Sequence, residues 1–363
     1  MKLAARGLVA VVTAAVVGVV PGVAFAGSDR GALQEKLDGV TATSAVGAVA
    51  EVRDGHRVWR GGSGVAVRET SQPVPIRGQF RVGSVTKTFV ATVVLQLVAE
   101  GKLRLDDSVE HWLPGVVPNG QNISVRELLN HTSGLFDYRL TLPRPGSPEF
   151  LDLRWRTLTP AELMAPALAH KPDFEPGKGY SYSNTNYLLV GEIIKKVTGH
   201  SYSDEVERRL IRPLGLSGTT MPRTSPWIRG AHMHGYLPTD AGIIDYTDMN
   251  PTLFGAGGDM ISTASDLNRF FDALLGGHLL PARLLKEMKK PGIEESTYGL
   301  GLSWHDTSCH IPVYGNDGDA LSYQAYSYST EDTRKQITVA VTPNFINNPD
   351  AAVDAVINQA ICN

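Results

Sequence analysis

The segment from residue 85 to residue 100 constrains the fold more than any other part of the chain. Apolar side chains cover nearly every face of the helix that it would form: Phe89, Val90, Val93, Val94, Leu95, Leu97 and Val98. A helix that is apolar all round has to be enclosed by protein. Gly101 stands where a helix usually ends. The sequence therefore predicts a buried central helix with other elements packed around it.

Extended patterns lie near both ends of the chain, and helical patterns fill the middle. Residues 46–53 and 56–60 are joined by Asp54-Gly55, a strong hairpin signal. Further strands are expected at 311–314, 321–329 and 335–341. Between residues 103 and 245, short helical patterns alternate with loops rich in proline and glycine, and we find no convincing strand pair there. The expected fold is α/β: one antiparallel sheet built from both ends and flanked by terminal helices, with an inserted, mainly helical lobe.

The N-terminus reads as a secretory signal peptide. Lys2 and Arg6 precede an apolar run at 8–20, and Ala24-Phe25-Ala26 supplies a small-x-small cleavage pattern. A membrane anchor is the alternative, but the run is shorter than the ~20 residues of a span. We therefore expect a secreted protein with no membrane span after signal removal. The expected organisation is a signal peptide at 1–26, the first part of the sheet domain at 27–105, the helical lobe at 106–254 and the second part of the sheet domain at 255–363.

Charge and cysteine content narrow the class of protein. The formal net charge is −3, which gives no indication of a nucleic-acid partner. The only cysteines are Cys309 and Cys362. In an exported chain these favour one disulfide over two free thiols, and they are too few to indicate a metal site. We expect a monomer that acts on a small-molecule or peptide substrate.

The start of the buried helix carries a candidate nucleophile. Ser84 follows Gly83 and opens the helix, and Lys87 lies one turn later on the same face. A serine hydroxyl needs an adjacent base, and burial lowers the pKa of a lysine so that it can serve as one. Alone, the Ser-x-x-Lys spacing is common, and a capping serine beside a solvated lysine would explain it.

Two further segments favour the catalytic interpretation of Ser84 and Lys87 over the capping one. Tyr182 and Asn184 point the same way in an extended loop, where a phenol can relay a proton and an amide can bond a substrate carbonyl. Gly315-Asn316-Asp317-Gly318 follows the expected strand at 311–314. Such a strand can present the N–H of Asp319, which would form an oxyanion hole with the N–H of Ser84.

This order of motifs resembles the penicillin-interacting serine hydrolases, a beta-lactamase-like family. Longer segments resemble the secreted D-alanyl-D-alanine carboxypeptidases of Streptomyces and their relatives: FRVGSVTKTF at 80–89, LNHTSGLFDY at 129–138, YSYSNTNY at 180–187 and YGLGL at 298–302. The resemblance covers nearly the whole mature chain, and both cysteines fit it. It implies a beta-lactamase/transpeptidase-like fold, an acyl-enzyme on Ser84 and proton handling by Lys87 and Tyr182. It also implies that Asn184 orients the acyl-side amide, that peptidoglycan stem peptides and beta-lactams are substrates, and that no metal or organic cofactor is needed.

The third motif departs from the family pattern, in which His-Thr-Gly or Lys-Thr-Gly receives a substrate carboxylate. Here Asn316-Asp317-Gly318 replaces it, Asp319 follows where the carboxypeptidase has a threonine, and Ser303 occupies the place of a helping arginine. Like charges a few Å apart repel by ~4 kcal/mol at an effective dielectric constant of 20. Arg334 or Lys335 could offset one aspartate. The substitution favours substrates whose leaving end is neutral or cationic.

Several functions therefore stay open at this point. A D,D-carboxypeptidase comes first, and an esterase, amidase or D-aminopeptidase on the same scaffold comes second. A beta-lactamase is a lesser third, because we identify no device that activates water for deacylation. A non-catalytic penicillin-binding-like protein is the remaining alternative. His131 is expected to hold its loop rather than to react.

Overall fold

The computed structural model describes residues 27–363, and the predicted signal peptide at 1–26 lies outside the described residues. The strands of the main sheet are β1 (Ala45–Asp54), β2 (Arg57–Gly64), β7 (Ser303–Asp306), β8 (Pro312–Asp319), β9 (Gln324–Thr330) and β10 (Lys335–Pro343). Two small pairs join β3 (Phe80–Arg81) to β6 (Ile261–Ser262) and β4 (Tyr236–Thr239) to β5 (Gly242–Asp245).

The main sheet is antiparallel and is built from both ends of the chain, as the sequence predicts. Its strand order is β2-β1-β10-β9-β8-β7. The second and third strands of this order, β1 and β10, pair with Val49 opposite Ala340, so that segments almost 300 residues apart lie side by side. Asp54-Gly55 forms the expected β1–β2 turn, with Asp54 opposite Arg57. The predicted α/β class is thus confirmed.

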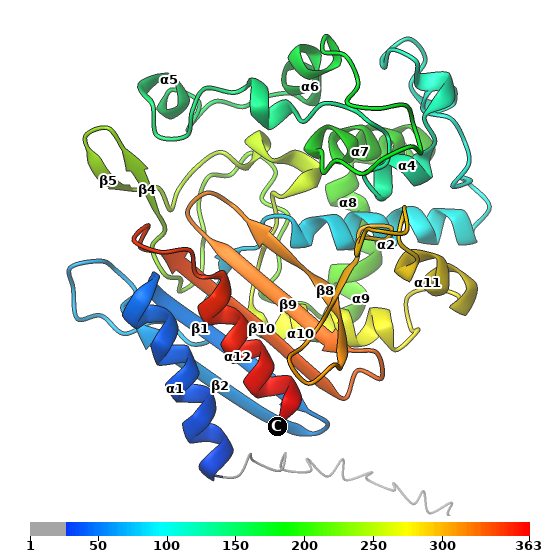
Figure 1. The fold of residues 1–363 in the computed structure, drawn as a ribbon. Coiled ribbons are helices and arrows are strands. Elements are labelled where there is room, and N and C mark those ends of the chain that lie inside the picture. Colours follow the sequence, from blue (N-terminus) through cyan, green and yellow to red (C-terminus); the bar gives the residue numbers. More distant parts are fainter. Residues whose placement is uncertain (1–26) are drawn as a thin grey trace, which may run out of the picture.

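Helices cover both faces of this sheet. The terminal helices α1 (Gly27–Thr43) and α12 (Asp350–Cys362) contact each other on one face (Figure 1). Leu37 and Ile357 belong to the apolar layer between these helices and the strands. On the other face, α10 (Ala264–Leu275) contacts the central strands and α2 (Val85–Ala99) contacts β8 and β9. The sheet is therefore sandwiched between two helical layers.

Helix α2 is the buried central helix that the sequence predicts. Twelve of its fifteen residues are buried. Phe89 stacks on Phe270 of α10 with ring centroids 3.5 Å apart. The enclosure of α2 on all sides fixes the position of the residue that precedes it, Ser84.

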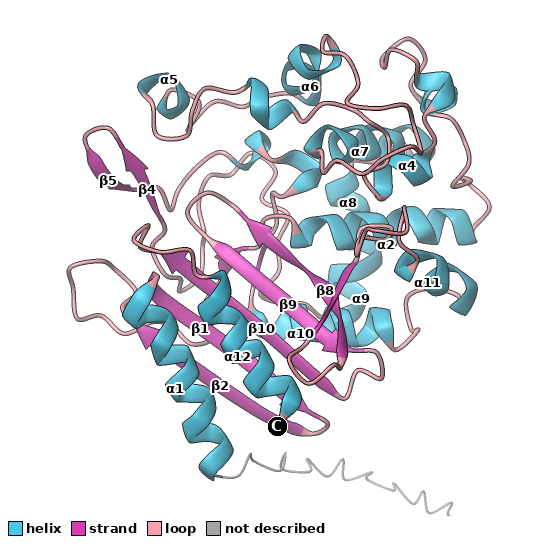
Figure 2. Ribbon diagram, in the orientation of Figure 1, coloured by secondary structure: helices cyan, strands magenta, loops and turns pink. Residues whose placement is uncertain are grey.

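The segment between the two halves of the sheet is mainly helical (Figure 2). Besides α2 and α10, it contains α3 (Val109–Trp112), α4 (Val125–Leu129), α5 (Pro148–Leu151), α6 (Pro160–Leu168), α7 (Asn184–Thr198), α8 (Tyr202–Val206), α9 (Arg212–Leu214) and α11 (Ala282–Lys289). The β4–β5 hairpin also lies here, so our expectation of no strand pair between residues 103 and 245 is wrong at this point. The domain boundaries at 105/106 and 254/255 stay a proposal.

The disulfide pairing expected for the cysteines is present. Cys309, in the turn between β7 and β8, bonds Cys362, the last residue of α12. Nearby, the Ser308 N–H donates to the side-chain carbonyl of Asn358 at 2.7 Å. The C-terminal helix is thereby tied to the strand that carries the third motif. None of the helices in the described part of the chain has the length and apolar character needed to cross a bilayer.

Candidate active site

Ser84 stands at the start of α2 with its hydroxyl free of any helix-capping bond. The hydroxyl oxygen instead lies 2.9 Å from the Lys87 Nζ and accepts a hydrogen bond from the Tyr182 hydroxyl at 2.7 Å. The alternative interpretation, a capping serine beside a solvated lysine, therefore does not describe this structure. Lys87 and Tyr182, which come from two distant segments that the sequence singles out, therefore both contact the Ser84 hydroxyl oxygen.

Lys87 is fully buried, and its Nζ is held by three oxygen atoms. Besides Ser84, these are the Asn184 Oδ1 at 2.8 Å and the Gly257 carbonyl at 2.7 Å. Burial, with a smaller contribution from Arg139, holds the pKa of Lys87 well below its usual value. Asn184 Oδ1 and Gly257 O can only accept hydrogen bonds. They therefore engage both N–H groups of the neutral amine, and its lone pair is left to face the Ser84 hydroxyl.

Tyr182 approaches the same oxygen from the loop that precedes α7. Burial raises the pKa of its phenol, and the hydrogen bond to Ser84 opposes that rise. The phenol is thus a hydrogen-bond donor at neutral pH. His131 supports this loop: its Nδ1 accepts from the Ser183 N–H at 3.2 Å and its ring lies 4.2 Å from the Tyr182 ring. These contacts agree with a positioning role for His131.

Asn184 begins α7 and connects Lys87 to a second layer of polar residues. Its Oδ1 accepts from Lys87, and its Nδ2 donates to the Asp137 carboxylate at 2.9 Å. Asp137 in turn pairs with Arg139 at 3.3 Å. Asp137, Arg139 and the Gly257 carbonyl are site groups that the sequence analysis missed. The FDY end of the segment at 129–138 was the one signal for Asp137.

Two glycines bring the end of β8 against the start of α2. Gly83 has φ = +52°, and a Cβ added to it would lie 2.7 Å from the Asp319 nitrogen. A Cβ added to Gly318 would lie 2.5 Å from the Ser84 nitrogen. Within the described residues the Ser84 N–H donates no hydrogen bond. The N–H groups of Ser84 and Asp319 therefore lie at one junction, beside the Ser84 hydroxyl.

The third motif lies inside β8 rather than after it, because Asn316 to Asp319 all pair with β9. On the other side, β7 pairs with β8 only as far as Gly315. Asn316 is buried, and its Nδ2 contacts the Thr88 hydroxyl of α2 at 3.2 Å. Asp317 and Asp319 are exposed. The segment from Asn316 to Asp319 therefore presents an edge free of β7 beside the nucleophile.

The charges of Asp317 and Asp319 have no ion-pair partner within the described residues. Arg334 bonds Asp54, and the Lys335 Nζ donates to the Ile361 carbonyl, so neither of the two expected cations reaches them. The Asp317 side chain keeps part of its surface exposed, but neighbouring protein displaces much of the water around it. This partial desolvation raises the pKa of its carboxyl group. Both carboxylates therefore lack an ion-pair partner among the described residues, and Asp317 accepts a hydrogen bond from the Tyr328 hydroxyl at 3.4 Å.

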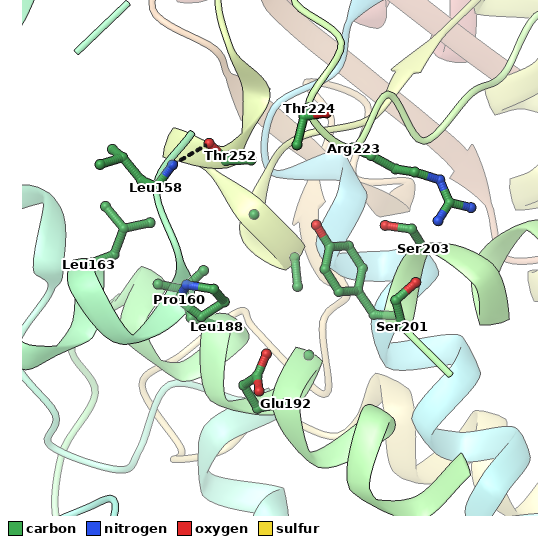
Figure 3. Close-up of a pocket in the computed structure, with 14 residues that line it drawn as sticks. Leu158, Pro160, Leu163, Leu188, Glu192, Ser201, Ser203, Arg223, Thr224 and Thr252 are labelled. Carbon is green, nitrogen blue, oxygen red and sulfur yellow. Dashed lines mark hydrogen bonds between the residues drawn. The ribbon is translucent and has the colours of Figure 1, made fainter. Parts of the chain in front are cut away.

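A cavity of about 270 Å³ lies on another side of the turn at Gly255–Gly257 (Figure 3). Leu158, Leu163 and Leu188 form an apolar wall, and the Arg223 side chain reaches away from the cavity toward Asp204, with which it pairs at 2.6 Å. None of the residues around the Ser84 hydroxyl lines this cavity. It reaches the site only through the turn that carries the Gly257 carbonyl.

The fold and this constellation define a serine hydrolase with a Ser-x-x-Lys arrangement and a tyrosine. The beta-lactamase family matches residues 20–361, and the chain belongs to that family of penicillin-binding-like serine hydrolases. As the sequence analysis expects, its relatives include proteins named for penicillin binding. Among the described residues we find no group of His, Cys, Asp and Glu side chains arranged to hold a metal ion.

Known proteins resemble the chain both in sequence and in three-dimensional structure. A Bacillus subtilis protein described as a candidate penicillin-binding protein is 32% identical over 255 residues, which are 69% of this chain and 60% of that protein. A solved D-stereospecific amidohydrolase from Streptomyces sp. is 39% identical, with a TM-score of 0.83 over 92% of this chain and 98% of that one. A D-amino acid amidase from Ochrobactrum anthropi, solved with L-phenylalanine amide, is 27% identical, with a TM-score of 0.79 over the same shares of each chain.

Proposed function

We propose that the protein is an amidohydrolase that cleaves amides and esters of D-amino acids through an acyl-enzyme on Ser84. The observation that carries the proposal is the open edge of β8, where Asp317 is exposed without a cationic partner among the described residues. A substrate whose leaving end is a carboxylate would be repelled there. The D-amino acid amidases that resemble this chain support the choice of an uncharged leaving end.

Acylation follows from the contacts around Ser84. The neutral Lys87 amine accepts the Ser84 proton as the hydroxyl oxygen attacks the substrate carbonyl carbon. The N–H groups of Ser84 and Asp319 stabilise the negative charge that develops on the carbonyl oxygen. The Tyr182 hydroxyl, held at 2.7 Å from the attacking oxygen, passes a proton to the leaving nitrogen as the carbon–nitrogen bond breaks. The Tyr182 phenolate then takes the proton that Lys87 had accepted, so the neutral amine and the phenol are both restored before deacylation.

Deacylation reverses the same proton transfers. Water attacks the ester carbonyl, Lys87 accepts a proton from that water, and the Ser84 hydroxyl is restored as the carboxylic acid leaves. Asn184 and Gly257 keep the Lys87 amine in place throughout, since both bond it directly. The net reaction consumes one amide and one water and yields an acid and ammonia or an amine.

A D,D-carboxypeptidase is the second candidate, because the chain resembles penicillin-binding proteins. The two functions make opposite demands on the leaving side: one substrate ends in a carboxylate and the other in an uncharged amide.

The location and assembly of the protein belong to the same proposal. We infer that it acts outside the cytoplasm, as a monomer, after the signal peptide at 1–26 is removed. The Cys309–Cys362 disulfide supports this location, because such bonds persist in oxidising compartments.

The test compares D-alanyl-D-alaninamide with D-alanyl-D-alanine, which differ only in the charge of the leaving end, under identical conditions. We expect kcat/KM for the amide to exceed that for the peptide by about 10-fold or more, given a repulsion of ~1–4 kcal/mol at the leaving end. Ser84→Ala should abolish both activities. Faster hydrolysis of the peptide would favour the carboxypeptidase, and activity that survives in Ser84→Ala would remove Ser84 from the mechanism.

A further inference from the structure

An apolar cavity of about 250 Å³ opens beside the end of β8. Its walls are mostly hydrophobic and come from three separate segments: Leu140, Leu142, Phe150, Leu253, Phe254 and Leu321. An apolar cavity of ~150 Å³ is large enough to hold benzene. The space therefore suits a phenyl or branched aliphatic group rather than a methyl group.

Two charged residues line this cavity, and both also belong to the candidate active site. Asp319 supplies the backbone N–H that lies near Ser84, and the same residue lines the cavity. Arg139 lines it too and pairs with Asp137, which bonds Asn184. The cavity therefore adjoins the site on the Asp319 side, and the residues that contact the Ser84 hydroxyl do not line it.

The balance of charge around this cavity is negative. Arg139 is paired with Asp137, and the low pKa of Lys87 favours its neutral amine. Asp319 has no cationic partner within the described residues. One of its carboxylate oxygens accepts the Leu321 N–H at 2.6 Å, in a turn where Leu321 has φ = +66°. This bond orients the carboxylate and leaves the other oxygen available to a ligand.

We propose that the cavity receives the side chain of the acyl residue and that Asp319 binds the α-ammonium group of the same residue. This rests on the proposed function and names its substrate class: amides of D-amino acids with a large apolar side chain and a free amino group. The three groups on one α-carbon would then meet three partners. The carbonyl meets the N–H groups, the side chain meets the cavity, and the ammonium meets Asp319.

The two aspartates have separate tasks in this arrangement. Asp319 lies on the acyl side, where a cation is attached to the substrate. Asp317 precedes it by two residues on the same strand and lies on the leaving side, where it disfavours a carboxylate. Contact at three points distinguishes the two enantiomers of a substrate, because exchange of any two groups breaks two contacts.

The test uses four amides with ammonia or amine release as the readout: D-phenylalaninamide, D-alaninamide, N-acetyl-D-phenylalaninamide and 3-phenylpropanamide. D-phenylalaninamide should exceed the two compounds without an ammonium by about 10-fold or more in kcat/KM, as expected for a hydrogen bond to a charged group. It should exceed D-alaninamide by about 10- to 100-fold, because the phenyl ring is buried.

Two variants separate the contribution of the ammonium group from that of the apolar side chain. Asp319→Asn keeps the backbone N–H and should reduce the preference for the free amine over the acetylated amide, measured as a ratio of kcat/KM within the same variant, to about 2-fold or less. Leu142→Trp fills the cavity and should lower kcat/KM for D-phenylalaninamide by about 10-fold while sparing D-alaninamide. Asp152→Asn, which neutralises an exposed carboxylate on the helical lobe, is the matched control. A preference for the free amine that survives Asp319→Asn, or a Leu142→Trp effect that is equal on both amides, would overturn the proposal.

A binding measurement separates this proposal from the proposed function. D-phenylalaninamide is titrated into Ser84→Ala by calorimetry, and Asp319→Asn on that background should weaken binding by about 10-fold. If wild type cleaves none of the amides but this binding difference appears, the proposed function fails and the subsite stands. If wild type cleaves the amides and the difference is absent, the subsite fails alone.

Discussion

The contacts around Ser84 and the exposed edge of β8 are neighbouring regions built in opposite ways. Around Ser84, the polar atoms of Lys87 and Asn184 are bonded by residues from α2, α7 and the turn at Gly255–Gly257. Along the edge, Asp317 and Asp319 are exposed and lack cationic partners among the described residues. The difference teaches that the chemistry depends on enclosure, whereas the choice of substrate depends on groups that can change without unfolding the protein.

The largest effect should come from the enclosed region. Lys87→Met removes the base and fills the same space with an apolar chain, so we expect kcat/KM to fall on the order of 10³-fold with the fold retained. Lys196→Met, an exposed lysine on α7, is the matched control. Steady-state hydrolysis of D-phenylalaninamide measures the effect. A variant within about 10-fold of wild type would contradict the role of Lys87.

The same base sets the pH profile of the wild type. The active form is the neutral amine, so activity rises with pH through the pKa of Lys87 and stays level above it. Because that pKa lies well below its usual value, the plateau should already cover neutral pH. A rise confined to the usual titration range of lysine, near ~10.4, would show that burial does not tune this group.

An intermediate effect is expected at the exposed edge. Asp317→Thr removes one repulsive charge, and we expect kcat/KM for a D-alanyl-D-alanine peptide to rise by about 10- to 100-fold. Asn316→His added to it should raise that activity further if the buried site tolerates the larger ring. D-phenylalaninamide, assayed with the same variants, controls for general effects. If neither variant gains carboxypeptidase activity, the electrostatic explanation of the altered third motif is wrong.

The last expected effect concerns stability rather than rate, and it tests how far water is excluded from the enclosed region. Asp259 follows the Gly255–Gly257 turn, and burial raises its pKa to about 7. The folded state therefore keeps a proton that the unfolded chain loses near pH ~4, so the stability contributed by protonation is lost as pH rises from ~4 to ~7. In Asp259→Asn this pH-dependent loss of stability is absent, because asparagine does not titrate.

Chemical unfolding of both proteins across this pH range measures the difference. The free energy of unfolding of Asp259→Asn, relative to wild type, should rise by up to about 4 kcal/mol between pH 4 and pH 7. The Tyr202 hydroxyl, which donates to the Asp259 carboxylate at 2.6 Å, can still donate to the asparagine carbonyl. Parallel stability curves for the two proteins would mean that Asp259 titrates as an exposed group.

Much of the scaffold could be predicted from local patterns. The helix predicted at 85–100 agrees with α2 to within one residue, because its continuous apolar surface and the glycine at position 101 define it well. The strand at 311–314 was predicted too short. Asn316, Asp317 and Gly318 have low strand propensity, yet pairing with β9 keeps them extended. The β4–β5 hairpin escaped notice because its strands are only four residues long.

In the candidate site, too, the local contacts could be predicted from the sequence and the long-range contacts could not. The spacing of Ser84 and Lys87 on one helix is a local property, and the sequence alone places the two side chains together. The bonds from Lys87 to Gly257 and from Asn184 to Asp137 join residues 170 and 47 positions apart, and no local pattern encodes them. The backbone carbonyl of Gly257 carries no side-chain signal at all.

The most direct test of the account is covalent labelling of Ser84. The mature protein and Ser84→Ala are each treated with a fluorescent fluorophosphonate and, in parallel, with a fluorescent penicillin that carries a carboxylate. The account predicts Ser84-dependent labelling by the fluorophosphonate and much weaker labelling by the penicillin, which Asp317 repels. Strong labelling of Ser84 by the penicillin would contradict the altered leaving side, and failure of both probes would contradict the activated serine itself.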